Sequence, residues 1–221
     1  MSMTVHLYLV RHGQTELNRS FKLQGRTNSA LTLKGIRDVR KLADRLNNIK
    51  FDRAFSSFSG RASETARIIV ETHPELREVE AVDGLAEYDF GGLENRSVFS
   101  FWWAVIHKIG PLGIFRLFFG KHRVRNVVRM FNMLDKTNSA ETMPEVSNRV
   151  LNTVREIIDK ELGNPQRDFN VLIVSHGLIL SAFLYGINPK KVPRLLLKNA
   201  SVSQVDFKNG QFKIVSVNKR G

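Results

Sequence analysis

Two histidines in the same local setting are the first candidates for chemistry in this sequence. His12 follows an apolar run that ends at Val10-Arg11, His176 follows one that ends at Val174-Ser175, and a glycine comes directly after each histidine. Glycine lets the backbone turn sharply where a strand ends. The turn leaves the imidazole at the edge of the sheet, near amides that can hold an anion. One His-Gly pair is more often a plain turn, but two pairs, the first preceded by Arg11, favour a functional site.

The elements that must position these histidines alternate between strands and helices. Apolar or alternating runs predict strands, helical periodicity with capping residues predicts helices, and an Asn-Gly pair predicts a terminal hairpin. The predicted strands are 5–10, 51–57, 77–85 and 170–175, the predicted helices are 32–48, 59–71, 142–162 and one that starts after His176, and the hairpin joins 201–207 to 212–218. This order predicts an α/β fold, a three-layer sandwich with a largely parallel central sheet flanked by helices.

In parallel sheets of this kind, ligands bind beyond the carboxyl ends of the strands. Both His-Gly pairs fall at such ends. The segment from about 92 to 140 interrupts the alternation, so we expect a helical cap insertion above that edge of the sheet. At 221 residues, one domain that carries this insertion is favoured over two domains.

Composition excludes several classes of site. The chain has no cysteine, which rules out disulfides, thiolate nucleophiles and cysteine-ligated metal sites and fits a cytoplasmic location. No signal peptide is recognisable at the N-terminus, and this also favours the cytoplasm. The net charge of +13 favours phosphorylated or polyanionic ligands or an acidic membrane surface.

The insertion differs in composition from the rest of the chain. Residues 96–134 contain no Asp or Glu but many aromatic and basic side chains, including both tryptophans, Trp102 and Trp103. With His107 and Lys108 inside it, the apolar stretch is a poor candidate to cross a bilayer. Four interpretations stay open: packing onto the domain, a cap for a substrate with an apolar part, a homodimer interface, and a helix that contacts an anionic membrane surface.

A longer series of residues extends the pattern around His12. Residues 11–18 are Arg-His-Gly-Gln-Thr-Glu-Leu-Asn, and further motifs follow in order: Gln24-Gly25, Leu31-Thr32, Gly35, Ser56-Ser57, Arg61-Ala62, Thr65-Ala66, Leu85, Glu87, Phe90-Gly91 and Ser175-His176-Gly177. Together they resemble the histidine phosphatase superfamily, in the branch that contains phosphoglycerate mutases and related phosphatases. The resemblance covers nearly the whole chain and implies a small phosphorylated substrate with neither a cofactor nor a metal.

The resemblance implies a role for each matched residue in transfer of a phosphoryl group. His12 would attack phosphorus and carry it as phosphohistidine, for which its imidazole must be neutral. Arg11, Arg61 and a protonated His176 would favour the neutral imidazole by repulsion between like charges. The same cations, with Asn18 as an uncharged donor, would hold the phosphoryl oxygens.

Glu87 matches the family's proton donor, and the phosphate's charge would keep it protonated for the leaving group. Asp89 is the local competitor for this role. Gln14, Thr15, Gln24 and Gly25 resemble positions that line the phosphate loop, where they bind substrate or fix the turns of the loop.

The residues around Glu87 favour a phosphatase over a mutase. Mutases of this family have a proton-donor segment close to Glu-Arg-His-Tyr-Gly and an Arg-Arg-Ser stretch in the insertion, and this sequence has neither. A cofactor-dependent phosphoglycerate mutase is the alternative. A metal site on His12, His176 and Glu87 is disfavoured, because Arg11 and Arg61 would repel a cation. A nucleic-acid-binding protein would leave the ordered motifs unexplained, so no nucleic acid partner is expected.

Overall fold

The chain folds into strands and helices that alternate over most of its length. The computed structural model describes residues 3–76, 78–119, 122–161, 167–192 and 197–220. The elements are β1 (Val5–Arg11), α1 (Glu16–Arg19), α2 (Leu33–Leu46), β2 (Arg53–Ser56), α3 (Gly60–Val70), β3 (Glu80–Ala81), the 3-10 helices η1 (Asp83–Leu85) and η2 (Gly91–Leu93), α4 (Val98–Phe119), α5 (Arg123–Leu134), α6 (Met143–Glu161), β4 (Phe169–Ser175), α7 (Gly177–Ile187), β5 (Ser201–Lys208) and β6 (Gln211–Arg220).

The strands form one sheet in the order β3-β2-β4-β1-β5-β6. β1, β2, β3 and β4 run parallel, while β5 and β6 are antiparallel. The predicted largely parallel sheet is therefore confirmed, and so is the terminal hairpin. Its turn places Asn209 and Gly210 at φ 51° and 75°, the left-handed pair that a tight hairpin favours.

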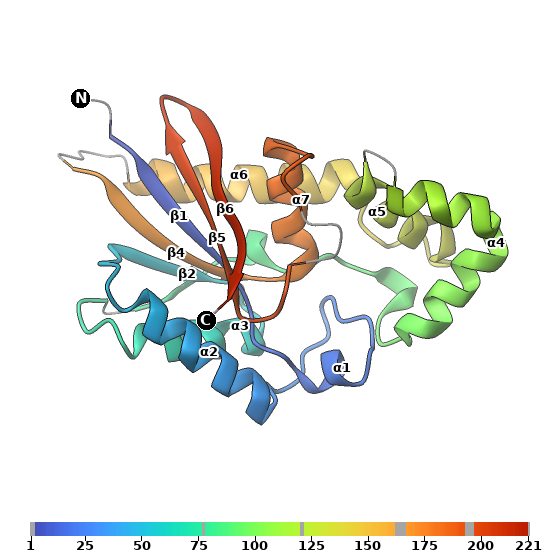
Figure 1. Ribbon diagram of the computed structural model, residues 1–221, viewed down its shortest axis with the longest axis horizontal. Helices are drawn as coiled ribbons and strands as arrows, with labels where there is room; N and C mark the ends of the chain where they lie inside the picture. Colours follow the sequence, from blue (N-terminus) through green and yellow to red (C-terminus); the bar gives the residue numbers. More distant parts are fainter. Residues whose placement is uncertain (1–2, 77, 120–121, 162–166, 193–196, 221) are drawn as a thin grey trace.

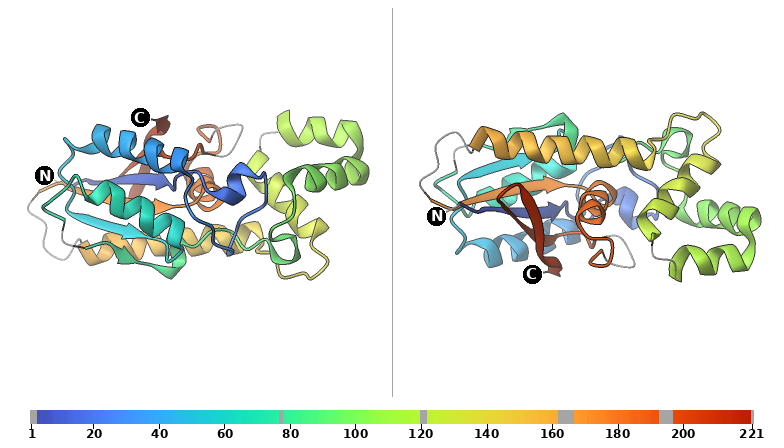
Figure 2. Two further views of the ribbon diagram at one scale, coloured as in Figure 1. Left: turned by 90° about the horizontal axis from the view of Figure 1, so that it is seen from below. Right: turned by 90° about the horizontal axis from the view of Figure 1, so that it is seen from above.

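Helices cover both faces of the sheet, which confirms the three-layer sandwich (Figure 1). Alternate residues of β1 face opposite layers, as the pleat of a strand requires. Leu7 and Leu9 join the core beneath α6 and α7, and Val10 joins the core beneath α2 and α3. Figure 2 shows α2 and α3 in front of the sheet from below, and α6 in front of it from above.

The predicted helical insertion consists of α4 and α5, which lie beyond the carboxyl ends of the parallel strands (Figures 1 and 2). α4 is kinked, because Gly110 adopts φ 67° immediately before Pro111. A proline ring cannot follow a regular helical turn without strain, and glycine tolerates the left-handed conformation. The segment is therefore two short helices joined at Gly110.

The predicted strand 77–85 is wrong over most of its length. Only Glu80 and Ala81 pair with β2, and the chain then enters η1. Gly84 lies so close to α6 that an added Cβ would stand 1.8 Å from the Thr153 hydroxyl. The alternation of charged and apolar residues is compatible with a strand, but the chain must turn here to carry Glu87 across the sheet edge. Arg77 lies outside the described residues.

The helix ends follow the predicted capping residues. Thr32 Oγ1 accepts a hydrogen bond from the Gly35 N–H at 2.9 Å at the start of α2. At the start of α6, Glu145 accepts from the Thr142 N–H at 2.7 Å, as the capping box requires. The predicted end of this helix at Leu162 lies outside the described residues.

Candidate active site

The two histidines meet because β1 and β4 are adjacent parallel strands. Their register pairs Arg11 with Ser175, and the His12 N–H donates to the Ser175 carbonyl at 3.0 Å. The imidazole centroids of His12 and His176 are 5.1 Å apart, and both side chains are buried. The two His-Gly turns therefore place their imidazoles side by side at the carboxyl edge of the sheet.

One hydrogen bond selects the reactive nitrogen of His12. Its Nδ1 lies 2.7 Å from the Gly13 carbonyl, which can only accept, so Nδ1 carries the proton and Nε2 has the free lone pair. Arg61 Nε donates to that lone pair at 3.3 Å. Burial, and then the charges of Arg11 and Arg61, hold the pKa of His12 well below its ordinary value. His12 is thus a neutral imidazole with Nε2 facing a guanidinium.

Arg61, at the start of α3, is an almost fully buried cation. Its Nη2 donates to the Gly25 carbonyl at 2.7 Å and its Nη1 to the Thr27 carbonyl at 2.9 Å. Burial lowers the pKa of Arg61 to about 10 against the opposing charge of Glu87, so the side chain stays charged at neutral pH. The loop that contains Gly25 and Thr27 therefore fixes the guanidinium beside His12.

Two buried nitrogen atoms at the site have no hydrogen-bond partner among the described residues, Arg11 Nε and His176 Nδ1. Arg11 also donates through Nη1 to the Leu197 carbonyl. An added Cβ at Gly177 would stand 2.9 Å from Arg11 Cζ, so the glycine makes room for this guanidinium. Unpaired buried polar atoms cost stability. Here both belong to residues next to the His12 imidazole.

The charge state of His176 differs from the prediction of a protonated imidazole. Burial, then His12 and Arg61, hold the pKa of His176 well below its ordinary value. Its Nε2 lies 3.3 Å from Ser59 Oγ. The surroundings of His176 in this structure therefore favour the neutral ring.

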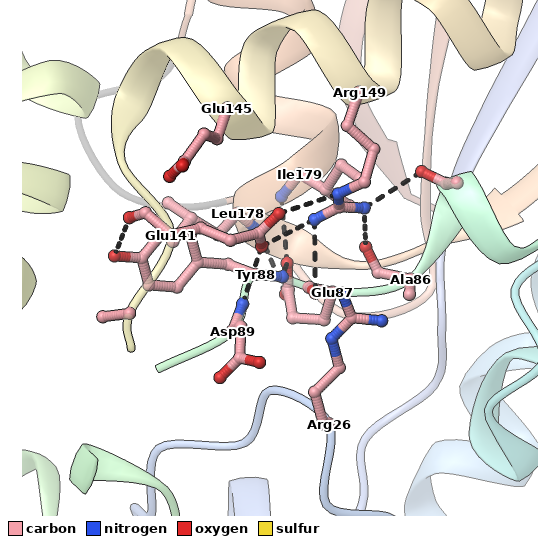
Figure 3. A network of polar contacts seen from close by, with 12 residues as sticks. Arg26, Ala86, Glu87, Tyr88, Asp89, Glu141, Glu145, Arg149, Leu178 and Ile179 are labelled. Carbon is pink, nitrogen blue, oxygen red and sulfur yellow. Dashed lines mark hydrogen bonds and ion pairs between the residues drawn. The ribbon is translucent and has the colours of Figure 1, made fainter. Parts of the chain in front are cut away.

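Glu87 is held where the segment after η1 crosses the start of α7. Its carboxylate accepts hydrogen bonds from the N–H groups of Tyr88 and Ile179 at 2.9 Å and of Leu178 at 3.1 Å (Figure 3). The first N–H groups of a helix lack partners within the helix and attract negative charge. Glu87 is buried, and its charge opposes the lowering of the pKa values of Arg11 and Arg61. It therefore faces the same cluster as His12.

Sequence reasoning missed the two residues that hold the Glu87 segment. Arg149 of α6 donates to both carboxylate oxygens of Glu141 at 2.7 and 2.8 Å and to the carbonyls of Gly84 and Ala86 at 3.0 and 2.8 Å (Figure 3). Glu141 also accepts from the Asp89 N–H at 2.8 Å. The planar fork of Arg149 thus clamps the chain on both sides of Glu87. No local sequence pattern reveals this pairing.

Asn18 is oriented by a further residue that was missed, Asn199. Asn199 Nδ2 donates to Asn18 Oδ1 at 3.0 Å and to the His12 carbonyl at 3.2 Å. Because the Oδ1 of Asn18 also accepts from the Thr15 N–H at 3.4 Å, its Nδ2 is left as a donor. The loop before β5 therefore sets the amide of Asn18 next to the His12 turn.

The other predicted substrate-binding residues make hydrogen bonds within the phosphate loop. Thr15 Oγ1 donates to Gln24 Oε1 at 2.7 Å. Gln14 Oε1 accepts from Thr32 Oγ1 at 3.0 Å. Gly25 supplies the carbonyl for Arg61 and has no room for a side chain, since a Cβ would stand 2.3 Å from the Tyr88 carbonyl. These contacts fix the turns of the loop, and direct contact with a substrate stays a prediction.

Asp89, the local competitor of Glu87, makes a hydrogen bond within its own turn. Its Oδ1 accepts from the Gly91 N–H at 2.8 Å. Within the described ranges, no three His, Asp or Glu side chains are grouped closely enough to hold a metal ion.

Comparison with known proteins bears on this arrangement. Residues 7–101 and 122–220 match the family model described as "Histidine phosphatase superfamily (branch 1)". The chain belongs to this superfamily. The sequence resemblance is therefore confirmed over both halves of the sheet, and residues 102–121, which include most of α4, lie outside the match.

The superfamily relatives bear different names. "Probable phosphoglycerate mutase GpmB" from Proteus mirabilis (strain HI4320) is 28% identical over 220 residues, which span 93% of this chain and 86% of that protein. The crystal structure of a phosphoglycerate mutase from Bacillus anthracis str. Sterne is 30% identical, with a TM-score of 0.90 over 99% of this chain and 94% of the other. YhfR of Bacillus stearothermophilus is 26% identical, with a TM-score of 0.72 and 96% of each chain covered.

Proposed function

We propose that this histidine phosphatase superfamily member hydrolyses phosphate monoesters through a phosphohistidine on His12. The observation that carries the proposal is the Nδ1 bond of the buried, neutral His12 to the Gly13 carbonyl, which leaves Nε2 as the nucleophile. Nε2 attacks phosphorus, the bond from phosphorus to the ester oxygen breaks, and that oxygen leaves with the electron pair. Water then attacks phosphorus, the bond to Nε2 breaks, and phosphate departs.

Charge around His12 supports this reaction. Phosphoryl transfer depends mainly on positioning and on neutralising the charge of the phosphoryl oxygens. Arg11 Nε and His176 Nδ1 are buried without partners among the described residues, which supports a role for both in binding those oxygens. Arg61 Nε, which donates to His12 in this structure, would donate to a phosphoryl oxygen once phosphorus approaches Nε2. Asn18 Nδ2 adds an uncharged donor.

Glu87 is proposed as the proton donor. The leaving alkoxide is a strong base and needs a proton, and a positioned carboxylic acid can supply it. In the second step the carboxylate takes a proton from the attacking water. The N–H groups that hold both of its oxygens keep the carboxyl group in place through both steps.

A phosphoglycerate mutase is the second candidate, favoured by the names of the Proteus and Bacillus anthracis relatives. A mutase must bind a further anionic group of its substrate and keep water from the phosphohistidine. Arg149 cannot supply that charge, because its donors are engaged by Glu141 and by backbone carbonyls. The sequence Glu87-Tyr88-Asp89-Phe90-Gly91 also differs from the proton-donor segment of the mutases. We therefore favour the phosphatase.

The test is a screen of phosphate monoesters, including p-nitrophenyl phosphate, sugar phosphates, phosphoglycerates and nucleotides. We expect release of inorganic phosphate from several of them and an acid-labile phosphoenzyme after rapid quenching. His12→Ala should lose the phosphoenzyme and about 10⁴-fold or more in kcat, since the nucleophile is gone. The surface variant His107→Ala is the control. Transfer between phosphoglycerate isomers that depends on bisphosphoglycerate would establish the mutase instead.

A further inference from the structure

The solvent-exposed face of α4 is apolar, whereas the exposed face of a helix packed on a domain is usually polar. The window Val98–Phe115 has a mean hydropathy of 1.3, yet only 11% of it is buried. Phe101 and Val105 pack into the core, while the large side chains on the outer face are exposed. Phe99, Trp103 and Ile106 follow the spacing that places them on one side of a helix. Trp103 is 66% exposed and Phe99 is 69% exposed. Packing onto the domain therefore explains only the inner face of α4.

The exposed face continues onto the loop around the candidate active site. The ring of Phe21, itself exposed, lies 5.4 Å from that of Phe99. Phe21 follows α1, whose capping interactions involve Asn18. We call Phe21, Phe99, Trp103 and Ile106 the α4 apolar surface. It joins the insertion to the loop that carries the proposed phosphoryl ligands.

Basic residues border this surface, and the sequence from Arg96 to Leu134 contains no acidic residue. Lys22 forms an isolated β-bridge with Ser97, and the Leu23 N–H donates to the Arg96 carbonyl at 2.9 Å. Both Lys22 and Arg96 are exposed, and these backbone contacts bring the segments that carry them together next to Phe21 and Phe99. Aromatic side chains combined with basic ones and no acids are typical of helices that lie in the interface of an anionic bilayer.

We propose that the α4 apolar surface docks this protein onto an anionic membrane surface. The kink at Gly110 and the burial of Phe101 and Val105 favour a helix that lies along the bilayer over one that crosses it. The aromatic side chains enter the boundary between headgroups and acyl chains, and the bordering cations contact the phosphates of the lipids.

A second copy of this chain fits the same surface less well. A twofold dimer places a patch against the same patch of the other copy, so the basic border of one copy would meet the basic border of the other. From Arg96 to Leu134 there is no Asp or Glu to pair with them. A lipid headgroup, in contrast, brings the missing negative charge.

The proposal is tested by co-sedimentation of the full chain with two kinds of vesicle, phosphatidylcholine alone and an equal mixture with phosphatidylglycerol. We expect binding to the mixed vesicles at low salt, weakened by added salt, with a blue shift of the tryptophan emission. Phe99→Ser with Trp103→Ser should weaken binding at least about tenfold through lost apolar contact. Lys22→Gln with Arg96→Gln should weaken it roughly 30-fold through lost charge.

Matched controls replace residues of the same kind on other elements. Leu33→Ser with Val215→Ser removes exposed apolar side chains from α2 and β6, and Lys41→Gln with Lys213→Gln removes surface charge; both pairs should bind as the unmodified protein does. Circular dichroism and thermal melting confirm that each variant is folded. The proposal fails if the protein does not bind mixed vesicles at low salt, or if the Phe99 and Trp103 variant binds undiminished. It also fails if ultracentrifugation finds a dimer that this variant dissociates.

Discussion

A proton on one nitrogen decides what His12 can do. The Gly13 carbonyl holds that proton on Nδ1, and Arg11 and Arg61 disfavour a second proton on the ring. The arginines therefore have two effects, since the charges that would bind a phosphoryl group also keep the imidazole nucleophilic. Glu87 adds a carboxyl group with fixed oxygens on the far side of the same cluster.

Glu87→Gln should separate substrates by their leaving groups. An alkoxide needs a proton in the transition state, whereas p-nitrophenolate leaves readily without one. We expect kcat/KM to fall by about 10²- to 10⁴-fold for alkyl phosphates and by about tenfold or less for p-nitrophenyl phosphate. Asp89→Asn is the matched control and should change neither value greatly. Equal losses for both substrates would show that Glu87 serves the structure of the site and not proton transfer.

The two buried histidines should make stability depend on pH. Both pKa values are lowered by folding, so below about pH 6.5 the unfolded chain binds more protons than the folded one. The contribution of the two histidines to the free energy of unfolding is therefore complete above about pH 6.5 and is lost as the pH drops from there toward the folded pKa values. Each histidine contributes up to about 1.4 kcal/mol per pH unit in that window.

Urea unfolding between pH 5 and 8 measures this slope. His176→Asn should reduce it by about one proton. A slope that survives His176→Asn would contradict the lowered pKa of His176.

Most residues of the candidate site could be predicted because they lie in short contiguous motifs. The others could not, because their partners are far away along the chain. His12, Arg61 and His176 follow strands or open helices in recognisable short patterns. Asn199 lies 187 residues from His12, whose carbonyl it binds, and nothing in its own neighbourhood marks it. The charge of His176 also escaped prediction, because it depends on burial and on neighbours that only the fold assembles.

The elements place the site through register and through one ion pair. Parallel β1 and β4 end level with each other, so the residues after them are neighbours without any further adjustment. The segment of Glu87 lacks a strand to hold it, and the pair of Arg149 and Glu141 does so instead, with side chains that are 20% and 16% exposed. The alternating pattern of 77–85 led to a strand prediction because it matches a strand locally. The prediction failed because the chain leaves the sheet there to reach α7.

Arg149→Met tests this support. It removes the donor to the Gly84 and Ala86 carbonyls and leaves the Glu141 carboxylate with the Asp89 N–H but no cation, so we expect a loss of about 2–4 kcal/mol in the free energy of unfolding. Activity should fall more for alkyl phosphates than for p-nitrophenyl phosphate, because the misplaced group is the proposed proton donor, Glu87. Arg149→Lys should restore little of the stability or activity, since lysine lacks the planar guanidinium that binds both Glu141 oxygens.

The exposed Arg155 of the same helix provides the control, as Arg155→Met. An unchanged preference between the two substrates in Arg149→Met would mean that the pair stabilises the fold without positioning Glu87.

In the molecule as a whole, the insertion is tied to the sandwich at Asp135. Its buried carboxylate accepts from the N–H groups of Gly92 at 3.0 Å, of Ser139 at 2.9 Å and of Ala140 at 2.8 Å, and from both the N–H and the hydroxyl of Thr137. Burial would raise the pKa of Asp135, but these hydrogen bonds outweigh it and hold the pKa below its ordinary value. Sequence composition revealed the insertion, but not this closure, nor which face of α4 stays exposed.

Asp135→Asn should loosen the insertion. The amide keeps one acceptor oxygen and places an NH₂ group against the remaining N–H donors, so we expect a loss of about 1–3 kcal/mol in stability. Limited proteolysis should then cut between α4 and α5 sooner than in the unmodified protein. Asp159→Asn, on the exposed face of α6, should show neither effect. An unaltered digestion pattern in Asp135→Asn would mean that the helices are held by other contacts.

Since Asp135 binds the backbone of Gly92, the two ends of the segment that contains α4 and α5 lie next to each other at the sandwich. A segment whose two ends are held together can change in length between those ends, provided that the side chains that it packs into the core, such as Phe101 and Val105, are kept. The two histidines can therefore stay unchanged while the segment above them is varied. A graft between Gly92 and Asp135 is the natural way to change which substrates this scaffold accepts.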